Sequence, residues 1–204
     1  MIAEKRIHLI LMLFLSAVFI WSAIKPHSYS TWWLEVTPLL FGLFILAAIY
    51  KHFKFTTLVY FFIFLQAISV LIGGHYTYSG MPVFDWLKEI FDWNRNHYDR
   101  FSHLFQGFGT ALIIRELLIR NVLIKQNNWL KVITSMLVLS VGALYELIEW
   151  WVAVIFGKEA EDFLGTQGDI WDAQWDMQLS FLGAILTVGL LSRIHDKFLK
   201  KDKS

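Results

Sequence analysis

Acidic side chains occur in this chain where the surrounding sequence is otherwise most apolar. Glu146 and Glu149 lie within one long apolar run, and Asp169, Asp172 and Asp176 lie at the start of the next. A carboxylate inside a membrane-spanning segment is costly, and such residues typically form ion pathways, proton relays or ligand sites. These five acids are therefore the first candidates for chemistry.

A third polar segment, RNHYDRFSHLFQG (residues 95–107), opens another apolar run. On a helix, Asp99 and His103 share a face because they are four residues apart, and Glu146 and Glu149 share one because they are three apart. The acids at positions 169, 172 and 176 fall within a sector of roughly 60° at 3.6 residues per turn. We expect the three segments to meet at one end of a helix bundle.

Carboxylates held close together cannot all stay ionised without a cation, because like charges and burial both raise their pKa. Helix bundles build metal sites from inward-facing Glu, Asp and His. The chain has no cysteine, and His with carboxylates suits Zn²⁺, Mn²⁺, Fe²⁺ or, with fewer histidines, Mg²⁺. We predict a divalent metal as cofactor, with these ligands: His103, Glu146, Glu149, Asp172 and Asp176.

A metal at this position could polarise a phosphoryl or acyl oxygen, or activate water against it. The substrate class we expect is a lipid-linked compound or another envelope precursor. His97 and Asp99 are the predicted catalytic residues, as candidates for a general base. This reading describes a metal-dependent membrane hydrolase or transferase.

Other interpretations of the same residues stay open. The acids at 172 and 176 could form ion pairs with Arg95 or Arg100, because buried acids in membrane helices commonly pair with bases. Asp169 follows Thr166 by three residues, as an acid at a helix start does. Glu35 could join the cluster or extend to water. At the level of function, the alternatives are a small proton-coupled transporter and a structural or partner-binding membrane protein without catalysis.

The whole chain is too apolar for an ordinary soluble domain. Of its 204 residues, 56% are hydrophobic and 17% are aromatic, and a helix needs about 20 mostly apolar residues to cross a bilayer. We predict an all-α, polytopic membrane helix bundle that forms one integral membrane domain over residues 1–204. Its six predicted transmembrane helices cover residues 7–24, 32–50, 55–73, 101–119, 129–156 and 172–194.

The distribution of charge predicts the orientation of these spans. If the first span starts in the cytoplasm, thirteen of the eighteen Lys and Arg residues fall on the cytoplasmic side, as the positive-inside rule requires. Both termini are then cytoplasmic, in the inner membrane of a bacterium, and the acid-rich segments face outward. His195 falls on the cytoplasmic side, where we expect it to be solvated or interfacial. The expected partner is the lipid bilayer, and nothing indicates nucleic acid.

The longest connection, between the third and fourth spans, contains PVFDWLKEIFDW (residues 82–93). Helical spacing places apolar residues on one side of this segment and charged residues on the other. Tryptophan and phenylalanine on the apolar side are typical of helices that lie in the membrane interface. We predict an interfacial amphipathic helix here. Its apolar face consists of Val83, Phe84, Trp86, Leu87, Ile90 and Phe91.

The strings RNHYDRFSHLFQGF (95–108) and GTQGDIWDAQWDMQLSFLGA (165–184) resemble the YjdF-type family of bacterial inner-membrane proteins. The resemblance covers nearly the whole chain, and it implies a multi-pass membrane protein without implying a reaction. The final third is also loosely similar to VanZ-type membrane proteins, through a polar pair on one helix and spaced acids that open the next. Gly168, Asp172 and Asp176 match the GxxxDxxxD end of the CDP-alcohol phosphotransferase motif, but its DxxDGxxAR half is missing and that activity is not implied.

Overall fold

The computed structural model describes residues 2–121, 123–157 and 161–201, and every regular element in these ranges is helical, as predicted. The long helices are α1 (Ile2–Ser22), α2 (Tyr29–Ile49), α3 (Thr57–Tyr76), α5 (Tyr98–Arg120), α6 (Asn128–Phe156) and α8 (Asp172–Leu186). The short elements are η1 (Tyr78–Gly80), α4 (Pro82–Phe91), α7 (Glu161–Leu164), the π-helical segment η3 (Thr187–Leu191) and α9 (Ser192–Lys201).

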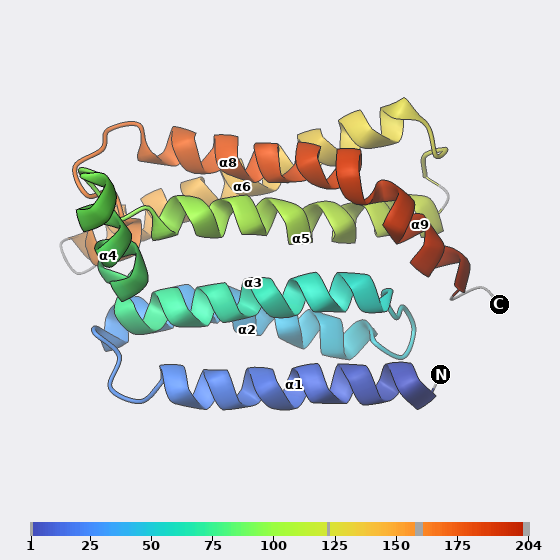
Figure 1. The fold of residues 1–204 in the computed structure, drawn as a ribbon, viewed down its shortest axis with the longest axis horizontal. Coiled ribbons are helices and arrows are strands. Elements are labelled where there is room, and N and C mark those ends of the chain that lie inside the picture. The colour runs from blue at the N-terminus through green and yellow to red at the C-terminus, as the bar shows by residue number, and fades with distance from the viewer. Residues whose placement is uncertain (1, 122, 158–160, 202–204) are drawn as a thin grey trace.

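The long helices form two groups that lie side by side (Figure 1). In the first group, α1 and α2 both pack against α3, and in the second, α6 and α8 pack against α5. The contact between α3 and α5 joins the groups. This arrangement places α5 in the middle of the bundle, with other helices around it.

Within the described residues, five helical segments are long and apolar enough to cross a membrane: Glu4–Ser22, Tyr29–Ile49, Thr57–Tyr76, Asn128–Phe156 and Asp172–Lys201. They correspond to five of the six predicted spans. The remaining predicted span, residues 101–119, lies in α5, which has 23 residues but carries buried Arg115 and Glu116. A helix that other helices surround does not need an apolar surface against lipid. α5 is therefore as long as a membrane span, about 35 Å, but is less apolar than the other spans.

The start of α1 and the end of α9 lie at the same end of the bundle, and α4 lies across the other end (Figure 1). An even number of spans requires such an arrangement of termini; the cytoplasmic location of that end remains a prediction. The amphipathic helix predicted after the third span is present as α4, whose residues Val83, Trp86, Ile90 and Phe91 are exposed. Its placement in a membrane interface also remains a prediction. We call the end with α4 the site end, and the other the terminal end.

Two glycines allow α5 and α8 to approach each other very closely. A Cβ atom on Gly107 would lie 2.1 Å from the carbonyl oxygen of Ser180, and one on Gly183 would lie 2.3 Å from the carbonyl oxygen of Leu104. Small residues commonly permit this kind of backbone contact in membrane helices. The hydroxyl of Ser180 donates to the carbonyl of His103 at 3.1 Å, so the two backbones are also fixed in register beside the acidic residues.

Candidate functional site

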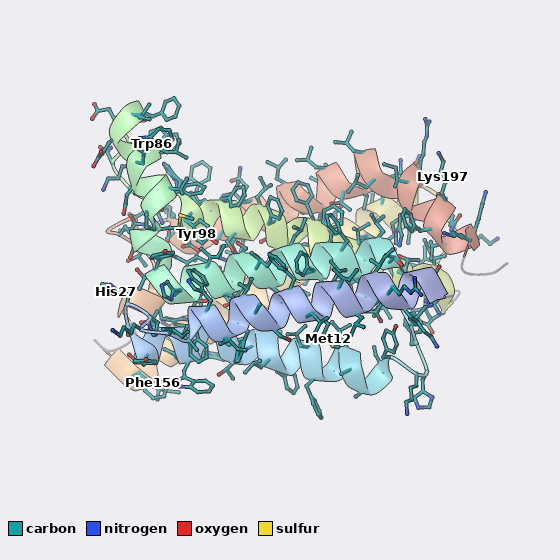
Figure 2. All side chains as sticks on the ribbon, turned by 60° about the horizontal axis from the view of Figure 1, so that its bottom comes forward. Met12, His27, Trp86, Tyr98, Phe156 and Lys197 are labelled. Carbon is teal, nitrogen blue, oxygen red and sulfur yellow. The ribbon has the colours of Figure 1, made fainter. Side chains whose placement is uncertain are left out.

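Three helices bring most of the predicted site residues together at the site end. Asp99 and His103 lie in the first two turns of α5, and Asp172 and Asp176 lie in the first two turns of α8. Glu146 comes from the second half of α6. Because α5 packs against both α6 and α8, the polar faces of the three helices meet inside the bundle. In Figure 2, Tyr98, which begins α5, lies at the same end as Trp86 of α4, while Lys197 of α9 lies at the opposite end.

Asp99, His103 and Asp176 form the centre of the site, and we call them the Asp–His–Asp group. All three are buried, and one ligand atom from each lies within 4.8 Å of the others. Nε2 of His103 is 3.4 Å from Oδ1 of Asp99 and 3.9 Å from Oε1 of Glu146. Ligand atoms of a tetrahedral Zn²⁺ at about 2.0–2.2 Å lie about 3.3–3.6 Å apart. The distance between His103 and Asp99 already meets this, and the wider distances in the group would have to shorten by up to about 1.5 Å on binding.

Several polar atoms of this region are buried without a hydrogen-bond partner among the described residues. They include Nδ1 of His103, Oδ1 of Asp176 and Oε1 of Glu146. Buried polar atoms in proteins are almost always paired, and each unpaired one costs free energy. Three unpaired atoms on three neighbouring helices indicate a position where a cation, a proton or water completes the structure.

A belt of ion pairs borders the group on its outer side. Arg95 pairs with the carboxylate of Asp172 and also lies 3.6 Å from Asp169. Arg100 pairs with Asp169 at 2.5 Å and lies over the ring of Trp175, 5.0 Å from its centroid. Both arginines near the site are thus paired with acids outside the Asp–His–Asp group. The group itself gains no arginine to balance its charge.

Asp169 lies in the loop before α8, and its carboxylate is well stabilised. The backbone N–H of Trp171 donates to it at 2.9 Å, and this bond, with the guanidinium groups of Arg100 and Arg95, holds the pKa of Asp169 below its usual value. Asp169 precedes the N-cap residue Trp171, so it does not itself cap α8; its role comes from this backbone N–H and the two arginines. Asp169 holds the loop in place and is not part of the Asp–His–Asp group.

The predicted metal ligands do not all lie in the same place. His103 and Asp176 are in the Asp–His–Asp group, and Glu146 is next to it, whereas Asp172 pairs with Arg95. Glu149 is half-buried on α6, one turn beyond Glu146, and is outside the group. Helical spacing predicts which residues share a face but not which of them meets an arginine from another segment.

The two predicted catalytic residues also differ in position. Asp99 is a member of the Asp–His–Asp group, so it is placed to ligate a cation rather than to act beside one. His97 is half-buried at the start of α5, with its ring 4.9 Å from that of Trp93. Partial burial and the nearby guanidinium groups of Arg100 and Arg95 lower the pKa of His97. A lowered pKa favours the neutral ring, which is the form that a general base needs.

Glu35 of α2 is the acid whose role the sequence left open, and the structure places it inside the protein. It is buried, close to the hydroxyl of Tyr78 and within electrostatic range of Asp99. The signal in the sequence was a single acid in a long apolar run next to Pro38. Glu35 therefore adds to the excess of negative charge on the inner side of the arginine belt.

The connection between α7 and α8 covers the Asp–His–Asp group. Gly165 lies so close to Asp99 that a Cβ atom on this glycine would be 2.9 Å from Oδ2 of the aspartate. Two residues later, the side-chain amide of Gln167 accepts from the backbone N–H of Asn96 and donates to its carbonyl, each at 2.9 Å. This two-point contact fixes the loop over the start of α5 and separates the group from solvent.

A second polar cluster lies at the terminal end, and there the carboxylate and the imidazole both have hydrogen-bond partners. Glu116 accepts from Nε2 of His195 at 2.9 Å and from the hydroxyl of Thr56 at 2.8 Å, and it pairs with Arg120 at 2.9 Å. Arg115 donates to Nδ1 of His195 at 3.0 Å. His195 is completely buried, so the expectation of a solvated or interfacial histidine is wrong. Sequence position near a helix end did not reveal that side chains of α9 hydrogen-bond to Arg115 and Glu116 of α5.

Two comparisons with known proteins agree with the resemblance noted in the sequence. The profile of a family described as "Predicted membrane protein (DUF2238)" matches residues 7–197, which include all three helices of the site. The inner membrane protein YjdF of Escherichia coli (strain K12) is 41% identical over 187 residues, or 92% of this chain and 90% of that protein. No solved structure matches.

Proposed function

The chain belongs to the DUF2238 family of membrane proteins, and on that premise we propose that it is a multi-pass inner-membrane protein that holds a divalent cation at its site end. The ligands are Asp99, His103 and Asp176, with Glu146 as a fourth donor. One histidine with two or three carboxylates suits Zn²⁺, Mn²⁺ or Fe²⁺ better than Mg²⁺, which prefers an all-oxygen shell.

The observation that carries this proposal is the set of unpaired buried atoms. His103, Asp176 and Glu146 each have a buried side-chain atom with no hydrogen-bond partner among the described residues. The arginines at positions 95 and 100 pair with Asp172 and Asp169 instead. A cation held between His103 and these carboxylates would give the unpaired oxygens of Asp176 and Glu146 a partner and balance their charge.

The proposed substrate is a phosphate-bearing lipid or envelope precursor. A cavity of about 440 Å³ at the site end is lined by Lys25, His27 and His75 together with the hydroxyl residues Thr77 and Ser79. Figure 2 shows His27 at the same end of the bundle as Tyr98. Lysine and histidine donors suit a phosphate group, and a bound cation would polarise a phosphoryl oxygen. His97, neutral and half-buried, is the proposed proton acceptor.

A proton-coupled transporter would use the same acids in a different way. Transporters typically hold their titrating groups near the middle of the bilayer, at broken helices. Here the Asp–His–Asp group lies at one end of the bundle, beneath the loop around Gly165. This position favours a site that works at one membrane surface.

Metal analysis of detergent-purified protein tests the proposal. We expect close to one equivalent of a transition metal in the wild-type protein, and its loss in His103→Ala and Asp176→Asn. Asp169→Asn is the matched control, since that acid pairs with Arg100 outside the group, and it should keep the metal. Absence of metal from wild-type protein after purification and after dialysis against Zn²⁺, Mn²⁺ or Fe²⁺ would refute the proposal.

The substrate class needs its own measurement. Lys25→Gln should weaken binding of a phosphate-bearing lipid in a pull-down with lipid vesicles and leave the metal content unchanged, because Lys25 lines the cavity and is outside the metal-ligating group. Equal lipid binding by the wild-type protein and Lys25→Gln would remove the phosphate-bearing substrate from the proposal and leave the cation site standing.

A further inference from the structure

A large apolar groove lies between α1, α2 and α3, away from the candidate metal site. It forms because α1 and α2 both pack on α3 and make few contacts with each other. Its volume is about 930 Å³, near the upper end of the range of about 300–1,000 Å³ that is usual for small-molecule sites. Its walls include Leu9, Met12, Leu15, Leu40, Leu43 and Phe44.

The groove opens sideways, toward the surface that hydrocarbon covers in a membrane. Met12 and Phe44 on its two rims are 58% and 70% exposed. Midway along the groove, Ser16 donates to the carbonyl of its own helix at Met12 at 2.9 Å, and the hydroxyl without a partner among the described residues, that of Tyr60, lies with His8 at the terminal end. Water would gain few hydrogen bonds against the apolar walls, and an empty apolar space would lose dispersion contacts. A hydrocarbon chain is the occupant that fits these walls.

The length of the groove is matched to a lipid rather than to a small solute. On α1 its lining runs from Lys5 to Ile20, which is about 22 Å at 1.5 Å per residue. One leaflet contributes about half of the 30 Å hydrocarbon core. A chain in the groove would therefore run from the terminal end of the bundle past the depth of one leaflet.

Polar residues occupy the terminal end of the groove. His8 hydrogen-bonds to the hydroxyls of Tyr50 and Thr57 at 2.9 and 3.1 Å, and its ring lies 4.5 Å from that of Tyr60. Lys5 is exposed at the same end and lines the groove. A cation and aromatic hydroxyls at the mouth of an apolar groove are complementary to an anionic headgroup on an apolar tail.

We propose that this groove binds one anionic phospholipid, with an acyl chain between α1 and α2 and the phosphate at Lys5 and Tyr50. The bound lipid fills the space that α1 and α2 leave open and thereby fixes α1 to the bundle. The site is at the end opposite the Asp–His–Asp group, so its occupation does not require the cation or the proposed reaction. It is a structural lipid site on the side predicted to be cytoplasmic.

Lipid retention by matched variants tests this proposal. Ala47 lines the groove, whereas its neighbour Ala48 does not, and both are exposed on α2. Ala47→Trp should fill the groove and remove the phospholipid that native mass spectrometry detects on the wild-type protein, and Ala48→Trp should retain it. Equal retention by the two variants would overturn the proposal. Circular dichroism on both variants identifies a folding defect. If either variant misfolds, the variants Lys5→Gln and Lys51→Gln test the proposal instead.

The headgroup is tested by added lipid. Phosphatidylglycerol should raise the Tm of the delipidated protein more than phosphatidylcholine does. Lys5→Gln should weaken this effect about two- to fivefold, as expected for one exposed ion pair, whereas Lys51→Gln, an exposed lysine at the same end outside the groove, should not. Equal effects of the two lipids, or stabilisation by a polyprenyl phosphate alone, would contradict the assignment to an anionic phospholipid. A crosslink between Met12→Cys residues of two copies would assign the groove to a dimer instead.

Discussion

Arg95, three residues before α5, pairs with Asp172, the first residue of α8, and both side chains are buried. The same guanidinium donates to the carbonyl of Gly165 at 3.2 Å. One arginine therefore holds the first turn of α8 and the loop that covers the Asp–His–Asp group. This relationship separates two kinds of acid on α8: Asp172, which pairs with an arginine, and Asp176 one turn later, whose Oδ1 has no hydrogen-bond partner among the described residues.

Removal of the arginine should be strongly destabilising. In Arg95→Gln, the carboxylate of Asp172 stays buried without a partner, and breaking a buried pair in this way costs about 3–5 kcal/mol. The double variant Arg95→Gln/Asp172→Asn should recover part of that loss, because it removes the unpaired charge. Thermal unfolding in detergent measures both. A double variant no more stable than Arg95→Gln would show that the pair is not the source of the effect.

Asp176→Asn should have the opposite effect on stability. With a chelator present, we expect this variant to be more stable than the wild-type protein by about 1 kcal/mol or more, because it removes one of several like charges held a few ångströms apart. Asp172→Asn, the matched change one turn away, should be destabilising under the same conditions. A loss of stability in Asp176→Asn comparable to that in Asp172→Asn would mean that Asp176 has a structural partner.

Much of this arrangement could be predicted from the sequence. Asp99 and His103 share a face at a spacing of four, and Glu146 and Glu149 were placed at the matching end of the next span from the rise per residue. A helix at residues 101–119 could be predicted despite the polar residues of α5, because the segment is long enough and apolar residues lie between the polar ones. Spacing of this kind predicts which residues share a face of one helix.

The pairing between helices could not be predicted in the same way. Whether Arg95 meets Asp172 or Asp176 depends on how α8 lies against the start of α5, and the close backbone contact at Gly107 and Gly183 is part of that packing. His195 shows the same limit. Its burial depends on how α9 continues from the π-helical segment, so that the imidazole meets Glu116, and no local pattern contains that information.

The loop before α8 should lose stability in acid. The pKa of Asp169 is held below its usual value by the N–H of Trp171 and by Arg100 and Arg95. The unfolded chain takes up a proton at a pKa of about 3.9, so the stabilisation from this acid is complete above that pH and is lost as the pH falls through the lower folded value. The difference in Tm between the wild-type protein and Asp169→Asn should thus be constant above about pH 5 and shrink below about pH 4. A difference that stays unchanged at pH 3 would contradict the role of the ionised carboxylate.

The contact between α5 and α8 should be the most sensitive position for a small substitution. In Gly107→Ala, the new Cβ would lie 2.1 Å from the carbonyl oxygen of Ser180, so the two helices must separate, and overpacking of this kind costs about 1–3 kcal/mol. Because Asp99 and His103 are on α5 and Asp176 is on α8, the separation should also weaken metal binding. Gly42→Ala is the control: nothing lies within 4 Å of its Cβ position on α2, and it should raise stability by about 0.5–1 kcal/mol. Metal content and Tm measured on both variants check this prediction, and Gly107→Ala protein with wild-type values of both would show that the glycine contact does not position the Asp–His–Asp group.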